Sequence, residues 1–164
     1  MVGGIGRHPP FSHRLVSTTV DTRCGAGERR ERPYLAALLK LLFEESESAA
    51  LALWISDQAG MPMVSSELAK VEVVRAARRL DADVVPAARV LMSQLDLIPL
   101  NSGLLDEAAD VGEPLLATLD AIHLASALSI QADLTAFVAY DNRLVAAAKA
   151  AGIESIRPSW ASPK

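Results

Sequence analysis

Cysteine and aromatic residues are scarce in this sequence. Cys24 is the single cysteine among 164 residues, which excludes an internal disulfide and a zinc site built on several cysteines. One free thiol fits a reducing cytosol. Phe, Trp and Tyr together make up 4% of the chain, and this argues against a protein that binds nucleic acid by stacking bases on aromatic rings.

The sequence also lacks an excess of positive charge and a long hydrophobic run. The 16 Lys and Arg residues are outnumbered by 20 Asp and Glu, and the net charge is −4. A nucleic-acid contact would therefore need a local basic patch. No apolar run approaches the roughly 18–20 residues that span a bilayer, and no signal-peptide core follows Arg7 and Arg14. We expect a cytoplasmic protein that does not associate with a membrane.

What the sequence does contain is a large apolar fraction, 51%, dominated by Ala and Leu. These are strong helix formers, and the length suits one domain with its own core. Residues 1–33 differ, because they are rich in Gly, Pro, Ser and Arg and show no period. We predict a disordered basic leader over 1–33, a single domain over 34–158 and a tail over 159–164.

Helix-like and strand-like patterns alternate after residue 33. Helices are expected over 34–43, 47–58, 67–80, 84–94, 101–111, 119–128 and 142–151, with Thr118 capping the sixth. Strands are expected over 63–65, 95–100, 136–140 and 154–156. Strands that alternate with helices in this way predict an α/β fold with a parallel sheet.

Three acids stand where a site would form. Glu72 lies inside a helix, Asp120 in the first turn of another, and Asp141 directly after a strand. Ligands of such sheets collect beyond the carboxyl ends of the strands, and oxygen ligands suit Mg²⁺ or Mn²⁺. A metal there can polarise a phosphoryl oxygen and activate a water, so no protein nucleophile is needed.

Each acid also has a plain structural interpretation. Asp120 also fits a residue that serves only its helix terminus, and Asp141 one that serves only a turn. Glu72 precedes Arg75 by three residues, which is the spacing of an exposed ion pair. His123 follows Asp120 by one turn, and we interpret it as a buried core residue or a neighbour of the site rather than a proton carrier.

One basic cluster lies outside the leader. Lys70, Arg75, Arg78 and Arg79 share the helix of Glu72. Its simplest interpretation is a solvated helix face, and the alternative is a patch that contacts phosphates.

Several segments resemble the PIN-domain family, and within it the VapC-type toxins of bacterial toxin–antitoxin pairs. LDAIHLASAL and FVAYDNRLVAAAKAAGI carry the resemblance most specifically. SSELAKVEVVRAARR resembles the acidic helix of the family, in which the glutamate before the arginine binds metal. LLKLLFEESES resembles the first helix and the turn after it. The likeness extends over about residues 34–158.

The resemblance implies a fold and an activity. The fold is a single α/β/α sandwich around a mostly parallel sheet of four to five strands. The activity is Mg²⁺- or Mn²⁺-dependent cleavage of RNA, blocked by a cognate antitoxin protein, and family members commonly form homodimers. By the same resemblance, Glu72, Asp120 and Asp141 are the catalytic, metal-binding acids.

The sequence departs from the family at its first strand. That strand normally ends in an aspartate just before the first helix, whereas here the chain runs straight into Ala36 and Ala37. Asp21 and Thr22 have a similar local sequence but lie far from that helix. Ala117 also replaces a frequent arginine. Three hypotheses remain open: an active ribonuclease, a module that binds an antitoxin or RNA without cleaving, and a damaged coding sequence that lost its first strand.

Overall fold

A five-stranded sheet forms the middle of the protein. The computed structural model describes residues 13–16, 37–45, 47–58 and 60–159. The strands are β1 (His13–Val16), β2 (Met63–Ser66), β3 (Asp96–Ile98), β4 (Leu134–Val138) and β5 (Ser155–Ile156). Their order across the sheet is β3-β2-β1-β4-β5, and every neighbouring pair is parallel. The α/β fold with a parallel sheet is therefore confirmed.

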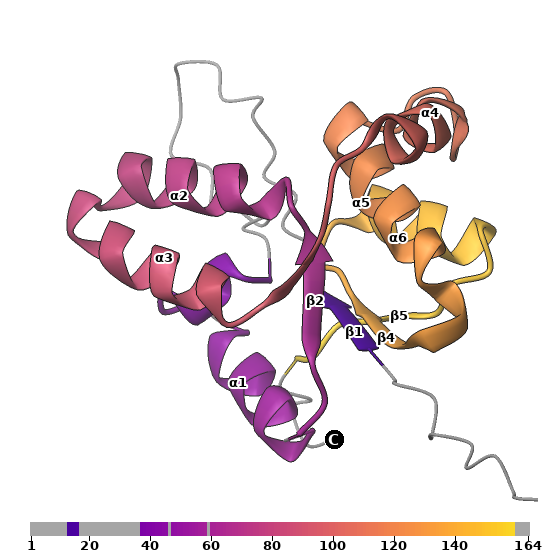
Figure 1. Cartoon of the computed structure of the whole chain (residues 1–164). Coiled ribbons are helices and arrows are strands. Elements are labelled where there is room, and N and C mark those ends of the chain that lie inside the picture. The colour runs from indigo at the N-terminus through magenta and orange to yellow at the C-terminus, as the bar shows by residue number, and fades with distance from the viewer. Residues whose placement is uncertain (1–12, 17–36, 46, 59, 160–164) are drawn as a thin grey trace, which may run out of the picture.

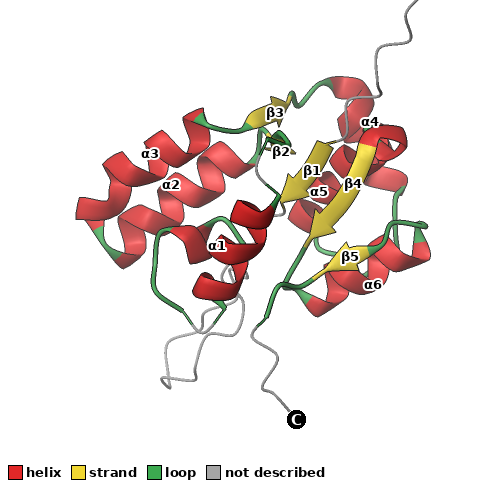
Figure 2. Cartoon of the chain, turned by 90° about the horizontal axis from the view of Figure 1, so that it is seen from below, coloured by secondary structure: helices red, strands yellow, loops and turns green. Residues whose placement is uncertain are grey.

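Helices connect the strands and cover both faces of the sheet. They are α1 (Ser48–Asp57), α2 (Ala69–Leu80), α3 (Val85–Ser93), α4 (Ser102–Asp110), α5 (Thr118–Ser129) and α6 (Asn142–Ala150), with 3₁₀ turns at Leu39–Leu41, Ala82–Val84 and Gln131–Asp133. Figure 1 and Figure 2 show α1, α2 and α3 on one side of the strands and α4, α5 and α6 on the other. This is the layered sandwich that the sequence resemblance implies.

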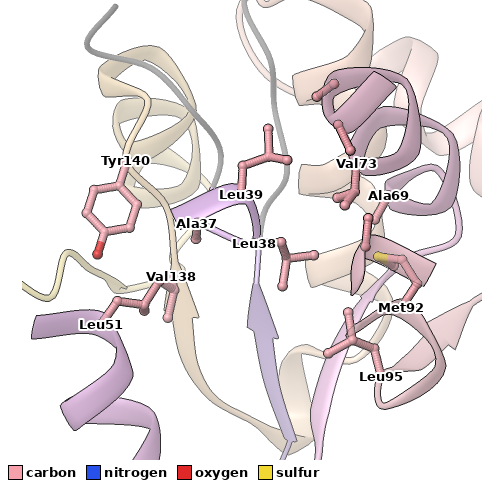
Figure 3. Close-up of a cluster of buried hydrophobic side chains, with 13 residues drawn as sticks. Ala37, Leu38, Leu39, Leu51, Ala69, Val73, Met92, Leu95, Val138 and Tyr140 are labelled. Carbon is pink, nitrogen blue, oxygen red and sulfur yellow. The ribbon is translucent and has the colours of Figure 1, made fainter. Parts of the chain in front are cut away.

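Alternating side chains of the segment around β4 enter different layers. Val138 and Tyr140 belong to a cluster that includes α2 and α3, and Figure 3 shows Leu38, Leu39 and Val73 in it. Phe137 and Ala139 belong to a second cluster with α5 and α6. Successive residues of a strand point to opposite faces, so this short apolar run anchors both helical layers to the sheet.

The connection between α4 and α5 contains a glycine that the backbone requires. Gly112 has φ +80°, and a Cβ added there would lie 2.7 Å from Leu116 Cδ2. Both observations favour glycine, because L side chains rarely adopt this conformation. The turn at Gly112 reverses the chain before α5, the helix that carries Asp120.

The N-terminal predictions need correction. His13–Val16 forms the central strand β1, so the prediction of a disordered leader is wrong for these four residues. β1 pairs with both β2 and β4, with a register shift against β4 between His13 and Arg14. These pairings give its backbone groups partners on two sides. A first strand is therefore present. Residues 1–12 and 17–36 and the tail from 160 lie outside the described residues.

Two local predictions also differ from the structure. In place of a helix over 34–43, the described part of that stretch forms only the 3₁₀ turn at Leu39–Leu41. Its apolar side chains pack deep in a core cluster, and this packing outweighs helix propensity. Thr118 is the first residue of α5, and Ala117 occupies the N-cap position.

Within the described residues, no helix combines the length and apolarity that crossing a membrane requires. The cytoplasmic location stays a prediction.

Candidate active site

The structure joins Glu72 of α2 to His123 of α5. Glu72 Oε2 and His123 Nε2 are 2.7 Å apart, and the two residues are 8% and 0% exposed. The alternative that Glu72 forms an exposed pair with Arg75 is wrong. Glu72 belongs to the buried stripe of α2, together with Ala69, Val73, Ala76 and Ala77, whose spacing of three and four residues follows one helix face. Arg75 is exposed.

Asp120 lies in the first turn of α5, as predicted, and is 3% exposed. The helix is buried on all sides from Asp120 to Ala127, because it packs under α4 and against the sheet. The N-terminus of a helix stabilises a nearby carboxylate by about 0.3–1 kcal/mol. Asp120 and His123 are three residues apart and therefore share one helix face. The imidazole thus contacts the buried Glu72 and shares a helix face with the buried Asp120.

Asp141 has a different structural role from Glu72 and Asp120. It follows β4 and is the N-cap of α6, where its Oδ1 accepts hydrogen bonds from Arg143 N at 2.7 Å and Leu144 N at 3.1 Å. The side chain is partly exposed. The interpretation of Asp141 as a turn and capping residue is confirmed, and its role as a metal ligand stays a prediction.

The spacing of the acids determines whether they could bind a hard cation. Among the described residues, no three His, Cys, Asp or Glu side chains gather closely enough to hold a metal ion. The structure therefore buries Glu72 and Asp120 on α2 and α5 but does not gather Glu72, Asp120 and Asp141 into one predicted set. Two buried carboxylates nevertheless fit Mg²⁺, which commonly uses one or two carboxylates and keeps several waters. Asp21 lies outside the described residues.

Comparison with known proteins agrees with this architecture. The PIN domain family matches residues 36–150. Ribonuclease VapC35 of Mycobacterium tuberculosis is 39% identical over 128 residues, which are 77% of this chain and 95% of that protein. The chain belongs to the PIN-domain family. Ribonuclease VapC47 of the same organism is 37% identical over 126 residues, covering 75% of this chain and 93% of its own length. Ribonuclease VapC46 is 39% identical over 124 residues, covering 76% and 94%.

Membership in the PIN-domain family confirms the resemblance that the LDAIHLASAL segment indicated. The family match begins at residue 36, so β1 (His13–Val16) lies before it. The central strand of this PIN domain thus comes from the very segment in which the sequence showed no recognisable family motif.

Sequence reasoning missed a second buried charge cluster. Lys40 is 4% exposed, and its Nζ lies 2.7 Å from Glu45 Oε2 and 2.8 Å from Glu47 Oε2. The same Nζ is 4.9 Å from the centre of the Tyr140 ring, and the Tyr140 hydroxyl donates to Pro158 O at 2.8 Å. We name Lys40, Glu45, Glu47 and Tyr140 the Lys40 cluster. The single lysine within an apolar run was the available signal.

The charges of the Lys40 cluster reinforce each other. Burial by itself lowers the pKa of Lys40, but hydrogen bonds and attraction from Glu45 and Glu47 outweigh it and raise the pKa above 10.5. Burial, helped by Glu47, raises the pKa of Tyr140 to about 12. Lys40 is therefore charged and Tyr140 neutral at pH 7. The cluster ties the segment before α1 to the end of β4, next to Asp141.

Proposed function

We propose that this PIN domain is a metal-dependent endoribonuclease and the toxin of a toxin–antitoxin pair. The relatives named above are ribonucleases. The single observation that carries the proposal is the burial of two carboxylates, Glu72 and Asp120. Carboxylates are rarely buried without a structural or functional reason.

In this proposal, Glu72 and Asp120 hold Mg²⁺ or Mn²⁺, and Asp141 contributes from the end of β4. A bound metal of this kind supplies a polarised phosphoryl oxygen and a water of lowered pKa. The chain's own task is to keep two negative side chains fixed in a buried place. α2 and α5 do this because each presents its acid on an inward-facing stripe.

The test is RNA cleavage by the purified full chain with Mg²⁺ or Mn²⁺. Asp120→Asn keeps the size of the side chain and removes its charge, and Asp106→Asn makes the same change at an exposed site on α4. We expect cleavage by the wild type and by Asp106→Asn, and its loss in Asp120→Asn. Equal activity in all three proteins would show that a contaminating nuclease cleaves the RNA and would reject the proposal.

A second candidate function is a PIN module that binds an antitoxin or RNA without cleaving. The observation that favours it is that the described residues gather no three metal-binding side chains. Calorimetric titration with Mn²⁺ separates the two functions. Micromolar binding that Asp120→Asn abolishes supports the enzyme, and its absence in a folded protein supports the binding module.

We also propose an antitoxin protein and a second copy of the chain as partners. Large apolar side chains are exposed on adjacent helices, with Val71 of α2 56% and Val90 of α3 58% exposed. Light scattering of the wild type against a Val71→Ser, Val90→Ser double variant tests the homodimer. Co-purification with the protein of the neighbouring reading frame tests the antitoxin.

A further inference from the structure

A buried hydrogen bond connects the two helical layers. Figure 1 shows α2 and α5 on opposite sides of β2, and the contact between Glu72 Oε2 and His123 Nε2 spans them at 2.7 Å. The two residues are 51 positions apart in the sequence. Neither side chain is at the surface, so the contact is held in one arrangement by the packing on both sides.

The chemistry of the pair determines its direction. The donor and acceptor roles depend on the tautomer of His123. A carboxylate accepts hydrogen bonds and donates none, so the tautomer that carries the proton on Nε2 is the one that would restrain Glu72. A glutamate side chain loses conformational freedom when it is held in place. A donor fixed on a buried helix supplies that restraint in advance, and it leaves the carboxylate plane in a defined orientation.

The position of His123 on α5 also relates it to Asp120. Asp120 lies three residues earlier on the same helix, so α5 carries one acid and the donor that orients the other. A movement of α5 would displace both together. Groups that hydrogen-bond to metal-binding carboxylates typically affect metal affinity or activity by about 10- to 100-fold.

We propose that His123 is a positioning residue: its Nε2–H holds the Glu72 carboxylate in the orientation in which Glu72 would bind a divalent cation. This inference rests on the proposed function, because it assigns His123 a role at that same site. His123 does not touch the RNA and transfers no proton. It acts only through Glu72.

Three substitutions separate the donor from the volume of the ring. His123→Gln keeps an N–H group at the distance of Nε2 from the backbone. His123→Asn places its N–H at the distance of Nδ1, and His123→Leu has no N–H. Full-length proteins are compared by calorimetric Mn²⁺ titration, by kcat and KM for RNA cleavage and by thermal unfolding.

We expect His123→Gln to bind Mn²⁺ within about threefold of the wild type, and His123→Asn and His123→Leu to bind about 10- to 100-fold more weakly. The loss in cleavage should fall on kcat, with KM for RNA unchanged. Mn²⁺ binding in His123→Leu equal to that of the wild type would overturn the inference. An equal loss in Gln and Leu variants would overturn it as well, because ring volume would then be the cause.

A measurement on the wild-type protein covers the case in which variants fail to fold. Nitrogen NMR of histidine-labelled protein without metal distinguishes a protonated from an unprotonated Nε2. A protonated Nε2 on His123 supports the inference, and an unprotonated one overturns it.

Failure of this inference and failure of the proposed function give different results. If the wild type binds Mn²⁺, Asp120→Asn does not, and the His123 variants bind normally, only the inference is rejected. If the folded wild type neither binds Mn²⁺ nor cleaves RNA, both are rejected.

Discussion

The Lys40 cluster and the pair of Glu72 with His123 are both buried charge groups, but their carboxylates lie at different depths. Glu45 and Glu47 keep 23% and 34% of their side chains exposed around a buried lysine. Glu72 and Asp120 are 8% and 3% exposed as whole residues. In the first group the protein supplies a cation that stays charged. In the second group, the partner of Glu72 is the buried imidazole of His123.

The comparison shows how structural and functional charge groups differ. The Lys40 cluster combines one buried lysine with two partly exposed carboxylates, which is close to charge balance, and it joins two segments of the chain. Its contribution is therefore to stability. Two deeply buried acids, of which one contacts an imidazole, cost desolvation energy. Such a cost persists in a protein when it serves binding or catalysis. The predictions below test this distinction, beginning with the largest expected effect.

Glu72→Gln should reduce Mn²⁺-dependent RNA cleavage by about 100-fold or more, because direct ligands matter more than their hydrogen-bonding neighbours. The thermal midpoint of the metal-free protein should stay the same or rise, because a neutral amide replaces a buried carboxylate. Cleavage assays and calorimetry on the same preparation check both parts. A lower thermal midpoint together with wild-type activity would show that Glu72 contributes to stability and not to metal binding.

Lys40→Met should lower the free energy of unfolding by about 2–3 kcal/mol, because two charge-assisted hydrogen bonds are lost and two carboxylates are left facing each other. Denaturant unfolding measures the loss, and Lys149→Met on the exposed side of α6 is the matched control with no expected change. Mn²⁺ affinity should not change. A loss of Mn²⁺ affinity in folded Lys40→Met would contradict the separation of the two groups.

Alkaline pH should weaken the Lys40 cluster specifically. The pKa values of Lys40 and Tyr140 are raised, the latter to about 12, so the folded state holds these protons more tightly than the unfolded chain. Their contribution is complete below about pH 10 and is lost as the pH rises towards 12, by about 2 kcal/mol at most. Thermal midpoints between pH 8 and 12 measure it. Tyr140→Phe should flatten the curve, and an unchanged curve would exclude Tyr140 as a cause.

Asp141 allows capping and metal binding to be separated. Asp141→Ala removes the acceptor for Arg143 N and Leu144 N and should cost about 1 kcal/mol of stability. Asp141→Asn retains an acceptor oxygen and should keep the stability. If Asp141 also binds the metal, both variants lose cleavage. Full activity in Asp141→Asn would restrict Asp141 to capping.

Much of the fold followed from local patterns in the sequence. The strand of MVSS at Met63–Ser66 and the helices α2 to α6 lie within a few residues of their predicted ranges. Asn101 accepts from Leu104 N at 2.9 Å as a helix cap, as its residue type suggests. The first strand was not predicted, because four residues within a Gly-, Pro- and Arg-rich segment are too few to show a hydrophobic alternation.

The site was predictable only in part. Asp120 at a helix start and Asp141 after a strand are visible in the chain order, because each position depends on its own neighbours. The position of Glu72 in the sequence allowed two interpretations. It could form an exposed ion pair with Arg75, or it could point into the protein as a metal ligand. Choosing between them requires knowledge of which side of α2 is covered.

The sequence by itself determined the alternation of helices and strands, the family and the acids worth testing, because residue order and type encode local structure and motifs. Only the tertiary structure decided that His13–Val16 completes the sheet, that Lys40 joins Glu45 and Glu47 beneath Tyr140, and that Glu72 meets His123. The reason is physical. Strand pairing and buried charge contacts join residues far apart in the chain, and their energies depend on what covers them.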